Sequence, residues 1–254
     1  MQKFKIAFFD IDGTIIDMNR GVMSKRMEQT LLNLQQENVL ICLATGRGPV
    51  NLPRFERVNF DAVIAFNGSY CYTQDKIIRK NLIPVNDVQK IIKNATNLNR
   101  PVALASADRM GANGKDQDLV DYFSFSKSVV TVVPDFDKMA TEDIYQIMLG
   151  CRAEDHAKLI DGVSGAKVTA WWDRAADIIP ATGGKGIAVQ EILDYFQLKK
   201  EDAIAFGDGG NDIDMLEAVG MGVAMGNAKA DVKAIANTVC GRVDEDGISL
   251  YLGL

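Results

Sequence analysis

Two aspartates lie two residues apart in the run Asp10-Ile11-Asp12-Gly13-Thr14, which follows the apolar segment Phe4–Phe9. Carboxylates this close repel each other unless a cation lies between them or one of them is protonated. A divalent cation that prefers hard oxygen ligands, Mg²⁺ above all, would satisfy both carboxylates. The run therefore predicts a metal site, and the alternative is an acidic turn with no further role.

A second acidic run, Gly207-Asp208-Gly209-Gly210-Asn211-Asp212, follows the apolar segment Ala203–Phe206. Its glycines would let the backbone approach a ligand closely, and Asp208 could complete a metal site. Asp212 could instead cap the helix that follows. An EF-hand is excluded because neither acidic loop has Gly at its sixth position and Glu at its twelfth, and the Gly-x-Gly-x-x-Gly spacing of a dinucleotide-binding loop is absent here.

Two further runs contain groups that suit an anion. Ala44-Thr45-Gly46-Arg47 offers a hydroxyl, backbone N–H groups at a helix start and a guanidinium that could clamp an anion. Gly183-Gly184-Lys185-Gly186 places an ammonium group at a helix start, where it could neutralise a phosphate. The second run is not a Walker loop, because Gly186 stands where Ser or Thr is required. Taken singly, these runs are equally consistent with a helix cap and a solvated lysine.

The elements that must position these groups alternate along the chain. Short continuous apolar runs suit strands that are buried on both faces of a parallel sheet. Helical patterns begin near Ser24, Ile187 and Ile213, so the alternation predicts a doubly wound, mostly parallel, Rossmann-like α/β sheet. The carboxyl ends of parallel strands lie along one edge, so the four polar runs can converge there. The predicted strands are Phe4–Phe9, Val39–Ala44, Ala62–Phe66, Ala203–Phe206 and Gly222–Met225.

The middle of the chain has a different pattern. Strands mixed with helices there predict an inserted α+β domain, so we expect a core of residues 1–81 and 183–254 and a cap of residues 82–182. The expected segments are a helix at Val85–Leu98, a loop at Asp108–Asp116, a strand at Val129–Val133, a helix from Thr141, and strands at Gln146–Cys151 and Lys167–Trp172.

Composition excludes several classes of protein. The 254 residues are 47% hydrophobic and carry a net charge of −6, which disfavours a nucleic-acid partner. The four cysteines form no CxxC pair and the single His156 cannot complete a zinc set with them. No signal peptide and no run of membrane-spanning length is evident, so we expect a cytoplasmic protein without a membrane association or an obligate protein partner.

The four polar runs, in this order and spread over the whole core, resemble those of the haloacid dehalogenase superfamily, in its Cof-type (subfamily IIB) phosphatase branch. Asn67-Gly68 and the run Gly222–Asn227 are further points of resemblance. The resemblance implies a magnesium-dependent phosphoric monoester hydrolase that acts on a small phosphorylated metabolite through an aspartyl-phosphate. Sugar phosphates are the first expected substrates, with pyridoxal or flavin phosphates behind them. One departure is the segment before Lys185, Ile179-Pro180-Ala181-Thr182-Gly183-Gly184, which has Gly where such proteins often have Ser or Val.

The resemblance also implies roles for individual residues. Asp10 would be the nucleophile, Asp12 the acid and base, and Lys185 the neutralising cation. The Asp10 carboxylate, the Asp12 backbone carbonyl and Asp208 would hold Mg²⁺, and Asp212 would orient water ligands or Lys185. Thr45, Gly46 and Asn211 would bind the phosphoryl oxygens. The candidates for substrate specificity are Arg47, Asn67, Asp108, Arg109 and Lys115, and Asn113, Trp171 and Trp172 are further candidates.

Two other functions are compatible with these residues. A phosphomutase would use the same motifs but return the phosphoryl group to a sugar instead of water. A non-catalytic metabolite-binding or regulatory protein would also retain the fold, although loss of catalysis should erode at least one of the motifs.

Overall fold

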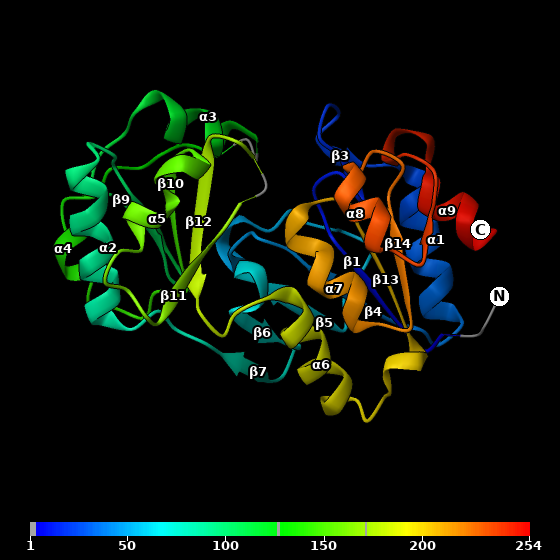
Figure 1. Ribbon diagram of the computed structural model, residues 1–254. Coiled ribbons are helices and arrows are strands. Elements are labelled where there is room, and N and C mark those ends of the chain that lie inside the picture. The colour runs from blue at the N-terminus through cyan, green and yellow to red at the C-terminus, as the bar shows by residue number, and fades with distance from the viewer. Residues whose placement is uncertain (1–3, 126–127, 171) are drawn as a thin grey trace. The chain divides into compact units, whose positions relative to one another are not determined.

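The computed structural model describes residues 4–125, 128–170 and 172–254. The chain forms two compact units (Figure 1). The first comprises the residues up to Gly46 together with Pro53–Lys80 and Gly184–Leu254, and the second comprises Arg47–Leu52 and Asn81–Gly183. The short segment Arg47–Leu52, which the sequence pattern assigned to the core, therefore groups with the inserted unit.

The first unit is built on one large, mostly parallel sheet. Its strands follow the order β15-β14-β13-β1-β4-β5-β6-β7 within the described residues. The pairs from β15 to β5 are parallel, and β6 and β7 extend the sheet with antiparallel pairs. The strands are β1 (Ile6–Phe9), β4 (Leu40–Ala44), β5 (Ala62–Ala65), β6 (Tyr70–Tyr72), β7 (Ile77–Lys80), β13 (Ala203–Gly207), β14 (Met221–Ala224) and β15 (Thr238–Val239), and a separate hairpin pairs β2 (Ile16–Asp17) with β3 (Val22–Met23).

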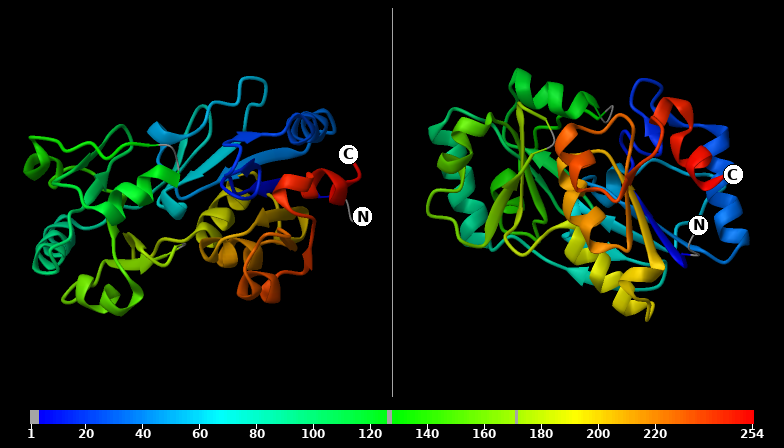
Figure 2. Two further views of the ribbon diagram at one scale, coloured as in Figure 1. Left: turned by 90° about the horizontal axis from the view of Figure 1, so that it is seen from above. Right: turned by 45° about the vertical axis from the view of Figure 1, so that its right-hand side comes forward.

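Helices cover both faces of this sheet, which makes it doubly wound as predicted (Figures 1 and 2). Successive residues of β1 pack on opposite faces of the sheet, since side chains along a strand alternate between the two faces. Phe8 lies in the apolar cluster that contains Val189 and Leu216. Phe9 stacks on Phe206, with ring centroids 5.3 Å apart. The helices are α1 (Lys25–Gln36), α6 (Lys185–Tyr195), α7 (Ile213–Ala218), α8 (Ala230–Ile235) and α9 (Gly247–Leu252), with short 3₁₀ turns at Phe66–Gly68, Lys200–Asp202, Gly210–Asp212 and Val243–Glu245.

Helix α1 forms for the local reasons that its sequence indicates. Ser24 is its N-cap, and the serine Oγ accepts a hydrogen bond from the backbone N–H of Met27 at 3.0 Å. Met27, Leu31 and Leu34 share one face and are buried. The cap and the apolar stripe together fix both the start of the helix and the face that it turns to the sheet.

The second unit has its own antiparallel sheet and core. The strand order is β11-β12-β10-β8-β9 in the part of the chain that the structure describes. Val88 and Ile91 of helix α2 (Val85–Asn97) are fully buried in one apolar cluster with Ile147 and Leu149 of strand β10 (Gln146–Gly150). The elements are β8 (Ala103–Ala105), β9 (Met110–Ala112), β10 (Gln146–Gly150), β11 (Ala166–Thr169), β12 (Ala175–Pro180), α2 (Val85–Asn97), α3 (Gln117–Phe125), α4 (Phe136–Met139) and α5 (His156–Leu159), with 3₁₀ turns at Pro49–Asn51 and Ala153–Asp155.

Several expectations for this unit were wrong. The predicted loop Asp108–Asp116 contains β9, which pairs with β8. The predicted strand Val129–Val133 contributes only a bridge between Val132 and Ala112. No helix starts near Thr141 in the described structure, because the threonine hydroxyl bonds back to the carbonyl of Lys138 at 2.7 Å and so closes the preceding helix α4.

The paired tryptophans of the sequence do not form part of a described strand. Trp171 lies outside the described residues, and β11 ends at Thr169. The ring of Trp172 lies 4.2 Å from the guanidinium carbon of Arg174 and packs edge-on against Phe125. Trp172 is therefore occupied by contacts within its own unit.

Candidate active site

The candidate active site lies in the first unit, at the carboxyl ends of three adjacent strands. β1 lies between β4 and β13, and Phe9 is level with Leu43 on one side and Phe206 on the other. Asp10, Thr45 and Asp208 follow these strands directly. Since the strands are parallel and in register, the three residues emerge at one edge, as the sequence predicted.

Three carboxylates meet at this edge. Asp10, Asp208 and Asp212 each offer an oxygen atom, and these atoms lie within 4.8 Å of one another. Burial and then the neighbouring Asp212 raise the pKa of Asp10 well above its usual value. The same two causes raise the pKa of Asp208 to about 7. A site whose carboxylates resist ionisation together suits a hard cation, so the donor set fits Mg²⁺.

Lys185 supplies a fixed positive charge within the cluster. The side chain is fully buried, and its Nζ lies 2.7 Å from Oδ1 of Asp10 and 2.5 Å from Oδ1 of Asp212. Burial alone would lower the pKa of Lys185, but the charges of Asp10 and Asp212 outweigh it and raise the pKa above its usual value. The lysine is therefore protonated at neutral pH and orients the Asp10 carboxylate.

Asp212 is engaged through both of its oxygens. Oδ1 accepts from Lys185, and Oδ2 accepts from the backbone N–H groups of Asp208 and Gly209, at 3.0 and 2.9 Å. The predicted ligand set comprised Asp10, Asp12 and Asp208, and the geometry adds the Asp212 carboxylate to the acidic cluster. Asp212 thus connects the lysine to the loop that carries Asp208.

The loop residues around Asp208 hold its side chain in place. Oδ1 accepts from the hydroxyl of Thr14 at 3.0 Å, and Oδ2 accepts from Nδ2 of Asn227 at 3.2 Å. Asn227 also donates to the carbonyl of Gly13 at 2.8 Å. Gly13 has a φ of +88°, and a Cβ there would lie 2.4 Å from Oδ2 of Asp208, so only glycine fits. Sequence reasoning noted the run that contains Asn227 but missed this role.

Asp12 is half-buried and its side chain is not part of the three-carboxylate cluster. Its backbone forms a bridge with Ile16 at the start of the β2–β3 hairpin. The roles expected for Asp12, acid/base through its side chain and metal ligand through its backbone carbonyl, stay predictions.

Two of the predicted phosphate-binding residues, Thr45 and Asn211, are hydrogen-bonded to the same residue, Asn67. Thr45 is buried and its N–H donates to the carbonyl of Ile64 at 2.8 Å. The N–H of Asn67 donates to the carbonyl of Thr45 at 3.0 Å. Nδ2 of Asn211 donates to Oδ1 of Asn67 at 2.9 Å. Asn67, predicted to contribute to specificity, therefore lies among the groups that were predicted to bind phosphate.

The other specificity candidates lie in the second unit. Asp108 accepts from Ser106 at 2.7 Å, and Arg109 pairs with Asp135 and Glu142 at 2.8 and 2.5 Å. Arg47 donates to the carbonyl of Asn51 at 3.2 Å, and Lys115 and Asn113 are exposed. Arg109 also lines a cavity of about 410 Å³ within this unit, together with Asn51, Met110, Phe123 and Thr131.

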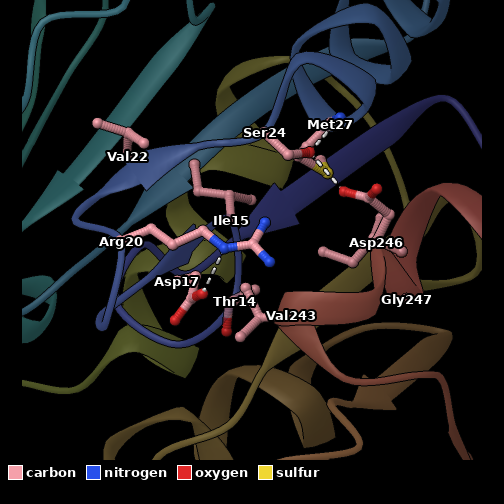
Figure 3. Close-up of a pocket in the computed structure, with 11 residues that line it drawn as sticks. Thr14, Ile15, Asp17, Arg20, Val22, Ser24, Met27, Val243, Asp246 and Gly247 are labelled. Atoms are coloured by element: carbon pink, nitrogen blue, oxygen red, sulfur yellow. Dashed lines mark hydrogen bonds and ion pairs between the residues drawn. The ribbon is translucent and has the colours of Figure 1, made fainter.

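A smaller pocket of about 110 Å³ lies on the hairpin side of the first unit (Figure 3). Arg20 and Asp17 pair across it at 3.3 Å, and Ser24 donates to Asp246 at its opposite wall. Thr14, which binds Asp208, also contributes to the lining. The β2–β3 hairpin is thereby connected to the loop of the acidic cluster.

The fold is a mostly parallel α/β sheet with an inserted unit, and the acidic cluster lies at the carboxyl ends of its strands. Residues 7–252 match the haloacid dehalogenase-like hydrolases, and the chain belongs to that family. It is 33% identical over 248 residues to YkrA of Bacillus subtilis (strain 168), which covers 96% of this chain and 95% of YkrA. It is 29% identical to the 5-amino-6-(5-phospho-D-ribitylamino)uracil phosphatase YitU of the same organism, over 96% of this chain and 94% of YitU.

Solved structures agree with this assignment. A subclass IIB sugar phosphatase of the haloacid dehalogenase superfamily superimposes with a TM-score of 0.88 at 28% identity, over 98% of both chains. The predicted family and the predicted enzyme class, a phosphoric monoester hydrolase, are confirmed. Among the described residues, no helix combines the length and the apolar character that crossing a membrane requires.

Proposed function

We propose that this chain is a magnesium-dependent phosphatase that hydrolyses a small phosphorylated metabolite through an aspartyl-phosphate on Asp10. The observation that carries the proposal is the buried pair of Asp10 and Lys185, 2.7 Å apart within the acidic cluster. An ammonium group beside the attacking carboxylate offsets its repulsion from a phosphate dianion and stabilises the charge on the transferring group.

In the first step, a carboxylate oxygen of Asp10 bonds to phosphorus while the bond from phosphorus to the ester oxygen breaks. Asp12 donates a proton to the departing oxygen, so the leaving group departs as a neutral alcohol. Thr45, Gly46 and Asn211 hold the phosphoryl oxygens during the transfer. All three adjoin the same residue, Asn67, which supports their shared role.

In the second step, the Asp12 carboxylate takes a proton from water as the water oxygen bonds to phosphorus. The bond between phosphorus and Asp10 breaks, inorganic phosphate leaves, and Asp12 is protonated again for the next cycle. Asp12 lies two residues after the proposed nucleophile and its charge acts on Asp10, which supports the assignment of the proton transfers to this residue.

Asp10, Asp208 and the backbone carbonyl of Asp12 would hold Mg²⁺. The bound cation supplies positive charge that offsets the charge of the carboxylates and of the phosphoryl oxygens. Asp212 is already occupied by Lys185 and two backbone N–H groups, which favours a positioning role for it.

Sugar phosphates are the first substrates to test. The resemblance to a subclass IIB sugar phosphatase supports this choice, as does the phosphoribityl substrate in the name of YitU. We assign substrate selection to the second unit, where a cavity of about 410 Å³ combines Arg109 with apolar side chains. We place the reaction in the cytoplasm, where four free thiols such as those of this chain remain reduced.

A phosphate-release screen over a panel of metabolites, with and without Mg²⁺, tests the proposal. We expect magnesium-dependent release from at least one ester, and we expect Asp10→Asn to reduce it to background while the protein stays folded. Asp75→Asn makes the same chemical change at an exposed position and should leave activity unchanged.

Two results would contradict the proposal. Near-normal phosphate release by folded Asp10→Asn would rule out Asp10 as the nucleophile. Turnover that requires a bisphosphate activator and yields an isomerised sugar phosphate would identify a mutase instead.

A further inference from the structure

The side-chain amide of Asn67 contains a buried donor that no described part of the chain satisfies. Asn67 is 2% exposed, and its Nδ2 has no hydrogen-bond partner among those residues. Its Oδ1, in contrast, accepts from Asn211 at 2.9 Å. A buried N–H that makes no hydrogen bond destabilises the folded state, and native proteins rarely leave one uncompensated. The amide therefore requires an acceptor from outside the chain.

The surroundings of this amide indicate what the acceptor is. A Cβ on Gly46 would lie 3.2 Å from both Nδ2 and Oδ1 of Asn67, so the amide packs directly against the Thr45–Gly46 segment. A Cβ on Gly68 would lie 2.1 Å from the carbonyl oxygen of Gly184, which precedes the buried lysine. The turn is thus enclosed by two segments that were independently expected to bind phosphate.

The backbone fixes the direction of the amide. Phe66, Asn67 and Gly68 are three consecutive residues with left-handed φ values of +50°, +52° and +92°. Bulky residues rarely adopt this conformation, whereas Asn and Gly adopt it more readily. Such a turn persists only when its surroundings hold it in place, so the side chain of Asn67 has little freedom to turn elsewhere.

We propose that Nδ2 of Asn67 donates a hydrogen bond to a non-bridging oxygen of the phosphoryl group. Asn67 would then bind the group that is transferred, rather than the remainder of the substrate as the family resemblance implied. The inference rests on the proposed phosphatase function. Charge gathers on the phosphoryl oxygens during transfer, and a neutral donor that is already positioned stabilises it without reorganisation.

Asn67→Gly removes the donor and keeps a residue that accepts a positive φ. We expect the affinity for inorganic phosphate, measured as competitive inhibition in the presence of Mg²⁺, to fall about 10- to 100-fold. Because every substrate shares the phosphoryl group, kcat/KM should fall by a similar factor for two chemically unrelated esters. Asn38→Gly is the matched control, since Asn38 is also left-handed, at φ +60°, but exposed.

Asn67→Asp is the second variant. It keeps the shape of the side chain and an acceptor for Asn211, but it presents a negative charge to the phosphoryl group. At pH 8 it should bind phosphate more weakly than Asn67→Gly. Burial at this position disfavours the charged form of the carboxyl, so a growing fraction should be protonated and able to donate as the pH falls to 5.5, and the kcat/KM of Asn67→Asp relative to wild type should rise. A residue that only shaped the turn would give no such recovery.

The outcomes separate this inference from the function on which it rests. Wild-type activity together with unchanged phosphate affinity in the folded Asn67 variants overturns the inference alone. A wild-type protein that hydrolyses no ester and binds no phosphate overturns both. Circular dichroism establishes folding, and Asn67→Asp, which retains the contact to Asn211, serves if Asn67→Gly unfolds.

Discussion

The carboxylate of Asp214 fills the space in which a side chain of Gly184 would lie. A Cβ on Gly184 would be 2.4 Å from Oδ2 of Asp214, and the φ of Gly184 is +152°. The same carboxylate accepts a hydrogen bond from the backbone N–H of Gly186, in the first turn of α6. This arrangement accounts for a glycine at the position before Lys185, and it makes Asp214 part of the support for the lysine.

Gly184→Ala should therefore destabilise the protein and reduce its activity together. The added methyl group would clash with Asp214, and alanine is disfavoured at this φ. We therefore expect a loss of about 2–4 kcal/mol in the free energy of unfolding. Displacement of the adjacent Lys185 should lower kcat more than it raises KM. Urea denaturation and steady-state kinetics measure the two effects.

Two further variants separate the causes of this loss. Gly253 has a φ of +75°, and a Cβ there would meet no atom within 4 Å, so Gly253→Ala isolates the backbone cost, about 1 kcal/mol. Adding Asp214→Ala to Gly184→Ala should recover part of the stability by removing the clash. Strictly additive effects in this double-mutant cycle would contradict a direct contact.

The metal-free protein should lose stability as the pH rises from about 4 to about 7, because the pKa of Asp208 is raised to about 7 in the folded state. Below this range both the folded and unfolded states hold the proton. Within it, the unfolded chain releases the proton while the folded chain keeps it, so the free energy of unfolding falls as the pH rises. Above about pH 7, the Asp208 carboxyl is ionised in both the folded and the unfolded protein, so its contribution to the free energy of unfolding no longer changes with pH.

Asp208→Asn tests this prediction. With the carboxylate gone, the metal-free variant should be more stable than the wild type at pH 8 by on the order of 2 kcal/mol, and the two should converge near pH 4. Mg²⁺ should raise the melting temperature of the wild type at pH 8 more than at pH 5, and that of the variant at neither pH. Equal stabilisation of both proteins by Mg²⁺ would exclude Asp208 as a ligand.

Removal of the buried ammonium group should be costly. Lys185→Met leaves the carboxylates of Asp10 and Asp212 without their cation, so we expect a loss of about 3–5 kcal/mol in the free energy of unfolding at pH 8. Combining it with Asp212→Asn removes one of those charges and should restore part of the stability. Activity should stay at background in both variants, because neither restores a cation beside Asp10.

Lys158→Met is the matched control for this change. Lys158 pairs with Asp155 at 2.7 Å, but its side chain is 66% exposed, so the loss of that solvent-screened pair should leave the free energy of unfolding nearly unchanged. A loss as large as that of Lys185→Met would show that burial does not decide the effect.

The sequence predicted the main features of the core because its signals there are local. Each polar run follows an apolar strand, and parallel pairing alone brings Asp10, Thr45 and Asp208 to one edge. Ser24 likewise acts as the cap that its position before an amphipathic stretch indicated. No knowledge of distant contacts was needed for these predictions.

Features that depend on distant contacts were not predictable in the same way. The side chain of Asn227 donates hydrogen bonds to Gly13 and Asp208, which belong to two other loops. The residues next to Asn227 in the sequence do not indicate that role. The segment Arg47–Leu52 carries no composition signal that assigns it to the second unit. The short strand β9 is defined by its pairing with β8 across a polar turn, and not by an apolar pattern of its own.

The position of β1 in the sheet has a consequence for synthesis of the chain. Its neighbours are β4, which follows soon after it, and β13, which is made only after the whole inserted unit. Until residues 203–207 leave the ribosome, one edge of this fully buried, apolar strand has no partner, and such edges promote aggregation. The insertion that separates the two halves of the core thus prolongs the period in which this edge of β1 is unpaired in the nascent chain.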